Sequence, residues 1–223
     1  MIAGLDEAGR GSVLGPLVVA GIMIKGSKAR KLRSLGVADS KKLTPKNRET
    51  LYSEILKVVD GYCIRRVNPA DIDRYVSARG LNLLEALTMA SIIDKLRPRI
   101  AYVDSCDVNP KRFKEAIVSR LKRRTRVDSR HHADSENVVV SAASIVAKVS
   151  RDREIAKLRQ NVGNVGSGYP SDRQTMGFVD NWICMHKKVP EFVRASWKPV
   201  RHLVEMHLQQ SPRFHSNRAQ AIA

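Results

Sequence analysis

The stretch Ile2-Ala3-Gly4-Leu5-Asp6-Glu7-Ala8-Gly9-Arg10-Gly11 opens the chain and decides how the rest of the sequence is interpreted. It predicts a short apolar strand that ends in two acids and leads into a Gly-Arg-Gly turn. The β-branched stretch Leu17–Ile24 follows and predicts a second buried strand, so that the two strands form a hairpin. A carboxylate at the tip of a buried strand loses hydration unless a cation offsets that loss. Asp6 and Glu7 are therefore candidate site residues.

Helices and strands alternate along the rest of the chain. We expect strands at 62–67 and 100–104 and an extended segment at 126–132. Helices are predicted from the cap Thr44 to Val58, through residues 69–97, from Pro110 to about Arg123, over 137–160, from the cap Ser171 to about Lys188, and in two pieces after Pro190 and Pro199. No internal repeat or flexible linker divides the sequence. The pattern predicts an α/β fold with a helical C-terminal part.

Positive charge dominates the composition. Among 223 residues, Lys and Arg number 40 against 22 Asp and Glu, a formal net charge of +18. The surplus concentrates in residues 25–48, with nine basic residues and one acid, and in residues 111–130, with nine basic residues and two acids. One such run is usually a solvated helix face. Two runs in so basic a chain favour a polyanionic partner, and nucleic acid in particular.

Several protein classes do not fit the sequence. No apolar run is long enough to span a membrane, and the N-terminus lacks the pattern of a signal peptide, so we expect a cytoplasmic protein. Cys63, Cys106 and Cys184 form no CxxC pair, which argues against a zinc knuckle. The glycines after the first strand miss the dinucleotide-binding spacing and lead into Pro16 instead of a helix.

Two further acids stand at comparable places. Asp104 ends the apolar strand 100–104, and Asp134 precedes the long helix. If the first strand and strand 100–104 lie side by side, Asp6, Glu7 and Asp104 converge. Oxygen-only clusters suit Mg²⁺ or Mn²⁺, and two such ions can promote phosphodiester cleavage. The alternative is that each acid only caps a turn or helix.

Other candidate residues lie in the second half of the chain. The long helix carries a polar stripe, Ser141, Ser144, Lys148 and Arg151, from which Lys148 could meet a phosphate. Tyr169 stands in a glycine-rich loop, either as a turn residue or as a platform that stacks on a sugar or base. The pair at 131–132 is interpreted as surface or hinge histidines.

Taken together, these segments resemble ribonuclease HII, the type 2 ribonuclease H family, in a form closer to archaeal than to bacterial members. The resemblance covers about residues 2–198. Its motifs, in chain order, are 2–11 with Gly15-Pro16, Asp39-Ser40-Lys41-Lys42-Leu43, Tyr102-Val103-Asp104, His132-Ala133-Asp134, 141–148 with Arg151-Asp152, and Gly166-Ser167-Gly168-Tyr169-Pro170-Ser171-Asp172.

The resemblance implies an RNase H-like fold, with a mixed central sheet flanked by helices and a helical C-terminal extension. We accordingly expect a catalytic domain at 1–175, a helical part at 176–210 and a flexible tail at 211–223. It also implies endonucleolytic cleavage of RNA paired with DNA and incision at single ribonucleotides in duplex DNA, leaving 5′-phosphate and 3′-hydroxyl ends. Mg²⁺ or Mn²⁺ would be the cofactor.

The resemblance also assigns residues to roles. The metal-binding carboxylates would be Asp6, Glu7, Asp104 and Asp134; the loop that reads the 2′-hydroxyl would be Gly9, Arg10 and Gly11; phosphate contacts would be Ser40, Lys41 and Lys148; and Tyr169 would pack on the adjoining deoxyribose. The step Ser135-Glu136-Asn137 departs from the family pattern, where we expect a local change only. The tail from Glu205 lacks a clean sliding-clamp motif, and we expect a monomer.

Two other functions fit part of the sequence. A non-catalytic basic nucleic-acid-binding protein would explain the charge but not the acids at strand ends. A nuclease directed at DNA alone would need the acids but not the Gly-Arg-Gly loop. Mg²⁺-dependent nicking of a duplex that contains one ribonucleotide, compared with an all-DNA duplex, would separate these functions.

Overall fold

The computed structural model describes residues 1–37, 44–78 and 80–208, and in this part of the chain a single mixed sheet has five strands. They are β1 (Ile2–Ala8), β2 (Leu17–Ile24), β3 (Gly61–Val67), β4 (Ile100–Asp104) and β5 (Arg126–Arg130), in the spatial order β3-β2-β1-β4-β5. β2 is antiparallel to both β1 and β3, whereas β1, β4 and β5 run parallel. The predicted hairpin and the mixed sheet are confirmed.

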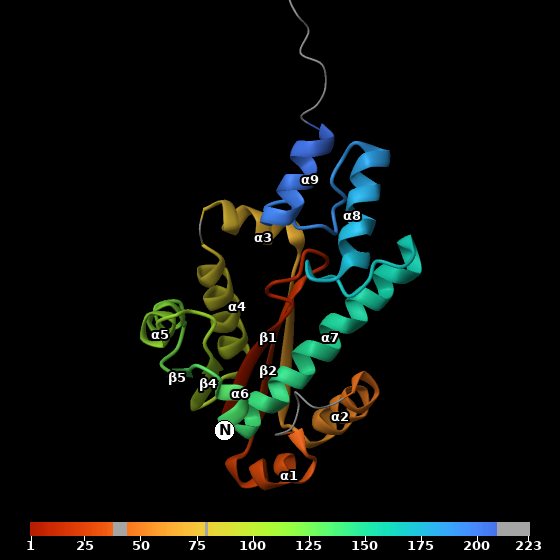
Figure 1. Cartoon of the computed structure of the whole chain (residues 1–223). Helices are drawn as coiled ribbons and strands as arrows, with labels where there is room; N and C mark the ends of the chain where they lie inside the picture. Colours follow the sequence, from red (N-terminus) through yellow and green to blue (C-terminus); the bar gives the residue numbers. More distant parts are fainter. Residues whose placement is uncertain (38–43, 79, 209–223) are drawn as a thin grey trace, which may run out of the picture.

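Helices cover both faces of this sheet (Figure 1). One face packs against the long helix α7 (Val138–Val162), with α1 (Ala29–Ser34) and α2 (Pro45–Val58) beside it. The other face packs against α4 (Leu81–Leu96) and α5 (Pro110–Val118). The remaining helical elements are η1 (Gly26–Lys28), α3 (Pro69–Ser77), α6 (Ala133–Glu136), α8 (Arg173–His186) and α9 (Lys198–Leu208).

Gly4 allows α7 to lie directly on β1. A Cβ atom at this position would overlap the backbone of Val139 and Val140 in the first turn of α7. The start of the long helix can therefore approach the middle of the sheet only because residue 4 has no side chain.

Three helix boundaries differ from the sequence prediction. α5 ends at Val118 and not near Arg123, because both carboxylate oxygens of Asp94 accept the N–H of Lys122 and turn the chain away. The helical stretch 69–97 is divided, as Gly80 N–H bonds the carbonyl of Tyr75 between α3 and α4. The cap of α8 is Asp172, not Ser171: its carboxylate accepts the N–H of Gln174.

The segment after Pro190 is not helical, which also corrects the prediction. Val193 pairs with Leu14 in an isolated antiparallel bridge, and Phe192 O accepts the N–H of Gly15 at 2.8 Å. Long-range backbone bonds to the loop after β1 therefore replace helical bonds in this segment.

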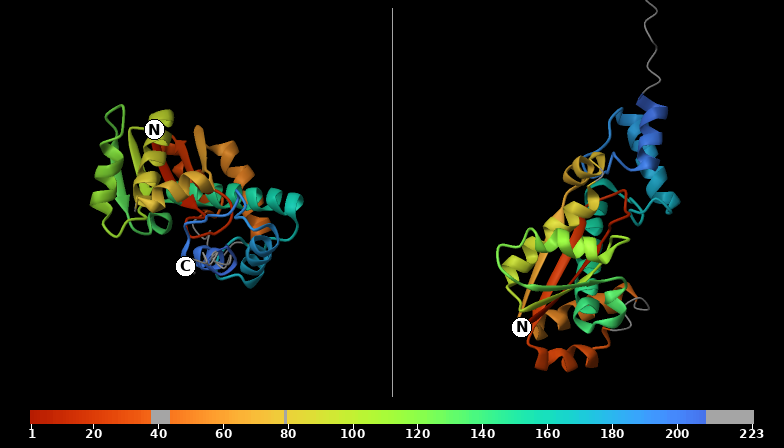
Figure 2. Two further views of the ribbon diagram at one scale, coloured as in Figure 1. Left: turned by 90° about the horizontal axis from the view of Figure 1, so that it is seen from above. Right: turned by 90° about the vertical axis from the view of Figure 1, so that its left-hand side faces the viewer.

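A third apolar core lies at the end of the molecule where α8 and α9 stack (Figure 2). It joins the C-terminal half of α7 to α8 and α9, and it includes Val13 and Leu14 from the loop after β1. The C-terminal elements thus support the Gly-Arg-Gly segment, while the boundary between residues 175 and 176 stays a prediction. No helix in the described residues has the length and hydropathy that a membrane span requires.

Candidate active site

Parallel pairing of β1 with β4 brings Asp6 and Asp104 together. The register of β1 against β4 places Leu5 opposite Val103, so Asp6 and Asp104 follow side by side at the carboxyl ends of these strands. Successive side chains of a strand point to opposite faces. Asp6 accordingly faces α7, and Glu7 faces α4.

Asp6 is a buried carboxylate, 5% exposed. Burial raises its pKa to about 6, and repulsion by Asp104 adds to this, whereas a hydrogen bond from Ser144, the N–H of Glu7 at 2.7 Å and the charge of Lys148 lower it. Lys148 Nζ in turn donates to Ser144 Oγ at 2.8 Å. The polar stripe on α7 therefore faces the acids as a Lys148–Ser144–Asp6 chain.

Glu7 is surrounded by more negative charge than Asp6. Burial raises the pKa of its carboxyl well above the usual range, and repulsion by Asp6 and Glu85 raises it further. Its Oε2 atom is enclosed and has no hydrogen-bond partner. An acceptor oxygen left unpaired beside other carboxylates is a position that a cation would satisfy.

The short helix α6 brings Asp134 to the same end of the sheet. Asp104 Oδ1 accepts the N–H of Ala133 at 2.7 Å, and the Ser141 hydroxyl donates to the carbonyl of Asp134. Asp134 is 7% exposed. His132 precedes α6 with φ 55° and turns the backbone here, and its side chain is exposed.

The segment Ser135-Glu136-Asn137, where the sequence departs from the family pattern, makes hydrogen bonds to its own neighbours. Ser135 Oγ donates to Asp134 Oδ1 at 3.3 Å, and Asn137 caps α7 by accepting the N–H of Val139. The acid keeps its place beside β4. Among the described residues, however, no three His, Cys, Asp or Glu side chains are already grouped as a metal site.

The Gly-Arg-Gly turn follows β1. Gly9 has φ 81°, a conformation that favours glycine, whereas an added Cβ at Gly11 would meet no atom within 4 Å. Arg10 points back toward α4, where its Nε lies 2.9 and 3.2 Å from the two oxygens of Glu85. Its Nη2 donates to Asn82 at 2.5 Å. The Arg10 side chain is therefore held against α4, and within the turn Gly9 is buried whereas Gly11 is exposed.

Sequence reasoning missed Glu85. This carboxylate is fully buried and forms an ion pair with Arg10. The available signal was a single acid inside the apolar stretch 83–87, a position where a charge needs a buried partner.

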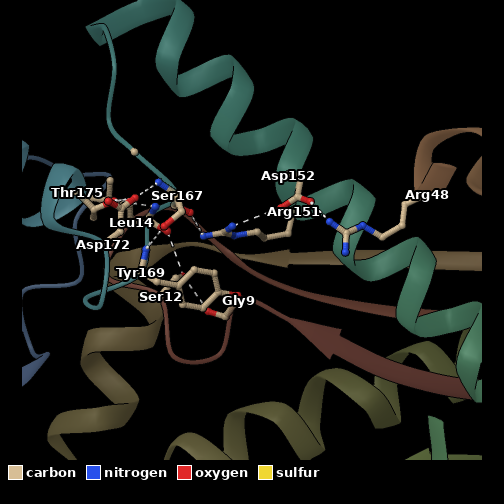
Figure 3. Close-up of polar contacts among 12 residues, drawn as sticks. Gly9, Ser12, Leu14, Arg48, Arg151, Asp152, Ser167, Tyr169, Asp172 and Thr175 are labelled. Carbon is tan, nitrogen blue, oxygen red and sulfur yellow. Dashed lines mark hydrogen bonds and ion pairs between the residues drawn. The ribbon is translucent and has the colours of Figure 1, made fainter. Parts of the chain in front are cut away.

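The Tyr169 loop lies beside the Gly-Arg-Gly turn (Figure 3). Gly168 O accepts the N–H groups of Val13 and Leu14 at 2.8 and 3.2 Å. Arg151 donates to Ser167 O at 2.7 Å, and its guanidinium lies over the Tyr169 ring. Residues far apart in sequence are thus brought together next to the acids.

Lys148 is the only predicted phosphate-contact residue within the described parts of the chain. Ser40 and Lys41 lie outside the described residues. Lys148 is half-buried, and its ammonium group lies within electrostatic reach of Asp6.

Comparisons with known proteins agree with this arrangement. The family model described as Ribonuclease HII matches residues 3–200. The Ribonuclease HII of Cenarchaeum symbiosum (strain A) is 54% identical over 201 residues, covering 90% of this chain and 97% of the relative.

Two solved structures share the fold along nearly their whole length. The crystal structure of the ribonuclease H2 from Pyrococcus horikoshii OT3 has a TM-score of 0.88 and 42% identity, covering 94% of this chain and 99% of that one. The RNase HII in a PCNA complex from Archaeoglobus fulgidus has a TM-score of 0.83 and 43% identity, covering 91% and 96%.

The fold, the buried acids and these likenesses define a ribonuclease H, an enzyme that acts on RNA–DNA hybrids. Ribonucleases H are metal-dependent. Within this class, the chain belongs to the ribonuclease HII family.

Proposed function

We propose that this ribonuclease H also incises duplex DNA at single ribonucleotides, by two-metal-ion hydrolysis that leaves 5′-phosphate and 3′-hydroxyl ends. The observation that carries the proposal is the position of the Gly-Arg-Gly turn. It directly follows the acids of β1, and the residues just after it, Val13 and Leu14, are hydrogen-bonded to Gly168 in the Tyr169 loop. Groups suited to recognise one nucleotide thus lie next to groups suited to cleave its phosphodiester.

Asp6, Glu7, Asp104 and Asp134 are the proposed ligands of Mg²⁺ or Mn²⁺. Their donor atoms are all carboxylate oxygens, which such hard cations prefer. The unpaired Glu7 Oε2 and the raised pKa values of Asp6 and Glu7 fit a cation, since positive charge would offset burial and mutual repulsion. The carboxylates would have to turn toward one another to enclose it. When bound, the cations would activate water and stabilise the leaving oxygen.

The remaining assignments concern the substrate. Main-chain groups of Gly9, Arg10 and Gly11 would hydrogen-bond the 2′-hydroxyl, the group that distinguishes RNA from DNA at a site. Tyr169 would pack on the neighbouring deoxyribose. Ser40, Lys41 and Lys148 would contact backbone phosphates, with Lys148 acting as a point charge held by Ser144.

We expect a monomeric cytoplasmic enzyme that serves ribonucleotide excision and DNA replication. The related RNase HII from Archaeoglobus fulgidus is described in a PCNA complex, which supports a sliding-clamp partner. The absence of a clean clamp motif after Glu205 argues against the same mode of attachment.

The test compares three duplexes of one sequence: an RNA–DNA hybrid, a DNA duplex with one ribonucleotide and an all-DNA duplex. We expect Mg²⁺- or Mn²⁺-dependent incision of the first two only, with the predicted end groups. Cleavage of the hybrid alone would overturn single-ribonucleotide incision. Cleavage of all three would point to a nuclease without ribonucleotide specificity.

The metal assignment is tested by Asp104→Asn, which removes a negative oxygen and preserves side-chain volume. Cleavage should nearly vanish while hybrid binding stays within a few-fold. The matched control is Asp128→Asn on the adjacent strand β5, whose carboxylate pairs with Arg130. Substantial Asp104→Asn activity at saturating Mg²⁺ would refute the assignment.

A further inference from the structure

Arg194 is the largest fully buried side chain of the described residues, and no motif in the sequence singled it out. It lies between two turns in the non-helical segment before α9, far from the carboxylates in sequence. No carboxylate of the described residues lies within ion-pair distance of its guanidinium. A buried charge without a charged partner destabilises a fold unless its hydrogen bonds compensate.

Those hydrogen bonds go to the two ends of one loop. Arg194 Nη1 donates to the carbonyl of Arg10 at 2.8 Å, and Nε donates to the carbonyl of Gly15 at 3.2 Å. The backbone N–H of Arg194 also donates to Val13 O at 2.9 Å. One residue therefore fixes the main chain at three points between residues 10 and 15.

The guanidinium is itself held in place. Its centre lies 5.0 Å from the ring centroid of Trp197, and its Nη2 atom is enclosed without a hydrogen-bond partner. Burial lowers the pKa of Arg194 to about 10, so the group remains charged at neutral pH. A planar fork that bonds two carbonyls at once is a geometry that lysine cannot reproduce.

We infer that Arg194 is a positioning residue for ribonucleotide recognition. By holding the Arg10 carbonyl, it sets the Gly9–Gly11 turn against the Tyr169 loop, to which Val13 and Leu14 are already bonded. The C-terminal segment thus determines how the turn presents its main-chain groups to a 2′-hydroxyl. This inference rests on the proposed function of the turn.

The experiment measures binding in the Asp104→Asn background, where cleavage is expected to be nearly abolished. Dissociation constants are determined for a duplex with one ribonucleotide and for the all-DNA duplex of the same sequence. Arg194→Lys keeps the charge but cannot bond both carbonyls. We expect it to reduce the preference for the ribonucleotide at least 10-fold, with the all-DNA constant changed less than about 3-fold.

The matched control is Arg201→Lys, an exposed arginine on α9, which should leave the preference unchanged. A merely structural role would lower the melting temperature or the active fraction without changing the ratio of the two dissociation constants. Arg194→Gln provides a second variant, since it removes the buried charge and keeps one donor. We expect its loss of preference for the ribonucleotide to lie between none, as in the unchanged residue, and that of Arg194→Lys.

The outcomes separate this inference from the proposed function. If Asp104→Asn alone shows no preference for the ribonucleotide, the proposed role of the turn fails. If that preference exists and Arg194→Lys retains it in full, the inference about Arg194 fails by itself. Failure of both Arg194 variants to fold would assign the residue to folding and would also overturn the inference.

Discussion

The guanidinium of Arg151 lies over the ring of Tyr169, 4.5 Å from its centroid, and is almost completely buried there. Arg151 comes from α7, the helix that also carries Ser144 and Lys148. Tyr169 comes from the loop that is hydrogen-bonded to Val13 and Leu14, just after the Gly-Arg-Gly turn. The stacked pair therefore connects the helix that faces the acids to the proposed sugar platform.

Arg151→Lys should weaken this platform. The change removes the planar stack and the hydrogen bond to Ser167 O, which together correspond to about a 10-fold loss of kcat/KM on a single-ribonucleotide duplex. The loss on a long RNA–DNA hybrid should be smaller, as it should be for Tyr169→Ala. Arg153→Lys is the control, because Arg153 lies on the same helix as Arg151 and stacks on Tyr52 of α2, away from the Tyr169 loop. Equal losses on both substrates would mean that the pair only supports the loop.

Gly11→Val should abolish selection of the ribonucleotide without disturbing the fold. The position has free space around it, so the added side chain is accommodated but obstructs the approach of a sugar. A site built to hydrogen-bond a hydroxyl favours substrates that carry it by a factor on the order of 10⁴ in kcat/KM, and this factor is lost with the hydrogen bond. Steady-state kinetics on the single-ribonucleotide duplex, with circular dichroism as the folding check, measure this effect. Activity near that of the unchanged enzyme would exclude main-chain recognition at this turn.

Asp6→Asn should stabilise the metal-free protein at neutral pH. The folded pKa of about 6 lies above the ordinary value of 3.8, so ionisation of Asp6 opposes folding as the pH rises through this window. The stability difference between variant and unchanged protein should therefore grow between pH 4 and pH 7.5, by up to about 3 kcal/mol. Urea unfolding in EDTA at the two pH values measures it. A difference that shrinks with rising pH would contradict the sign of the shift.

Lys148→Ala should reduce the salt dependence of hybrid binding. One lost phosphate contact lessens the slope of log affinity against log salt by about one. Lys157→Ala serves as the control, since Lys157 lies further along α7 and pairs with Glu154. Fluorescence anisotropy across a salt series gives both slopes. Identical slopes for the two variants would remove Lys148 from the phosphate contacts.

Gly4→Ala should destabilise the fold strongly, because the new methyl group would force the start of α7 away from β1. Overpacking of this kind costs about 1–3 kcal/mol or more, which lowers the melting temperature by several degrees. Gly26→Ala is the matched control, as an added Cβ there meets no atom within 4 Å. Equal melting temperatures for the two variants would show that α7 shifts without a loss of stability.

The sequence by itself determined most of the local elements and indicated the chemistry that they carry. Hairpin formation by β1 and β2 follows from two apolar runs joined by a glycine-rich turn. Thr44 starts α2 as predicted, since a side-chain oxygen caps the helix through bonds to its own neighbours. The order of the acidic and glycine motifs also indicated the ribonuclease HII family, which the comparisons confirmed.

Only the tertiary structure decided which distant residues meet. Pairing of β1 with β4 brings Asp104 beside Asp6, and the burial of Glu85 and Arg194 becomes visible only when their partners in the Gly-Arg-Gly loop are in place. The same long-range bonds hold the segment after Pro190 in two turns around the bridge residue Val193 instead of a helix. Local propensity could not predict this, because hydrogen bonds between segments almost 180 residues apart outweigh the preference of a short segment for a helix.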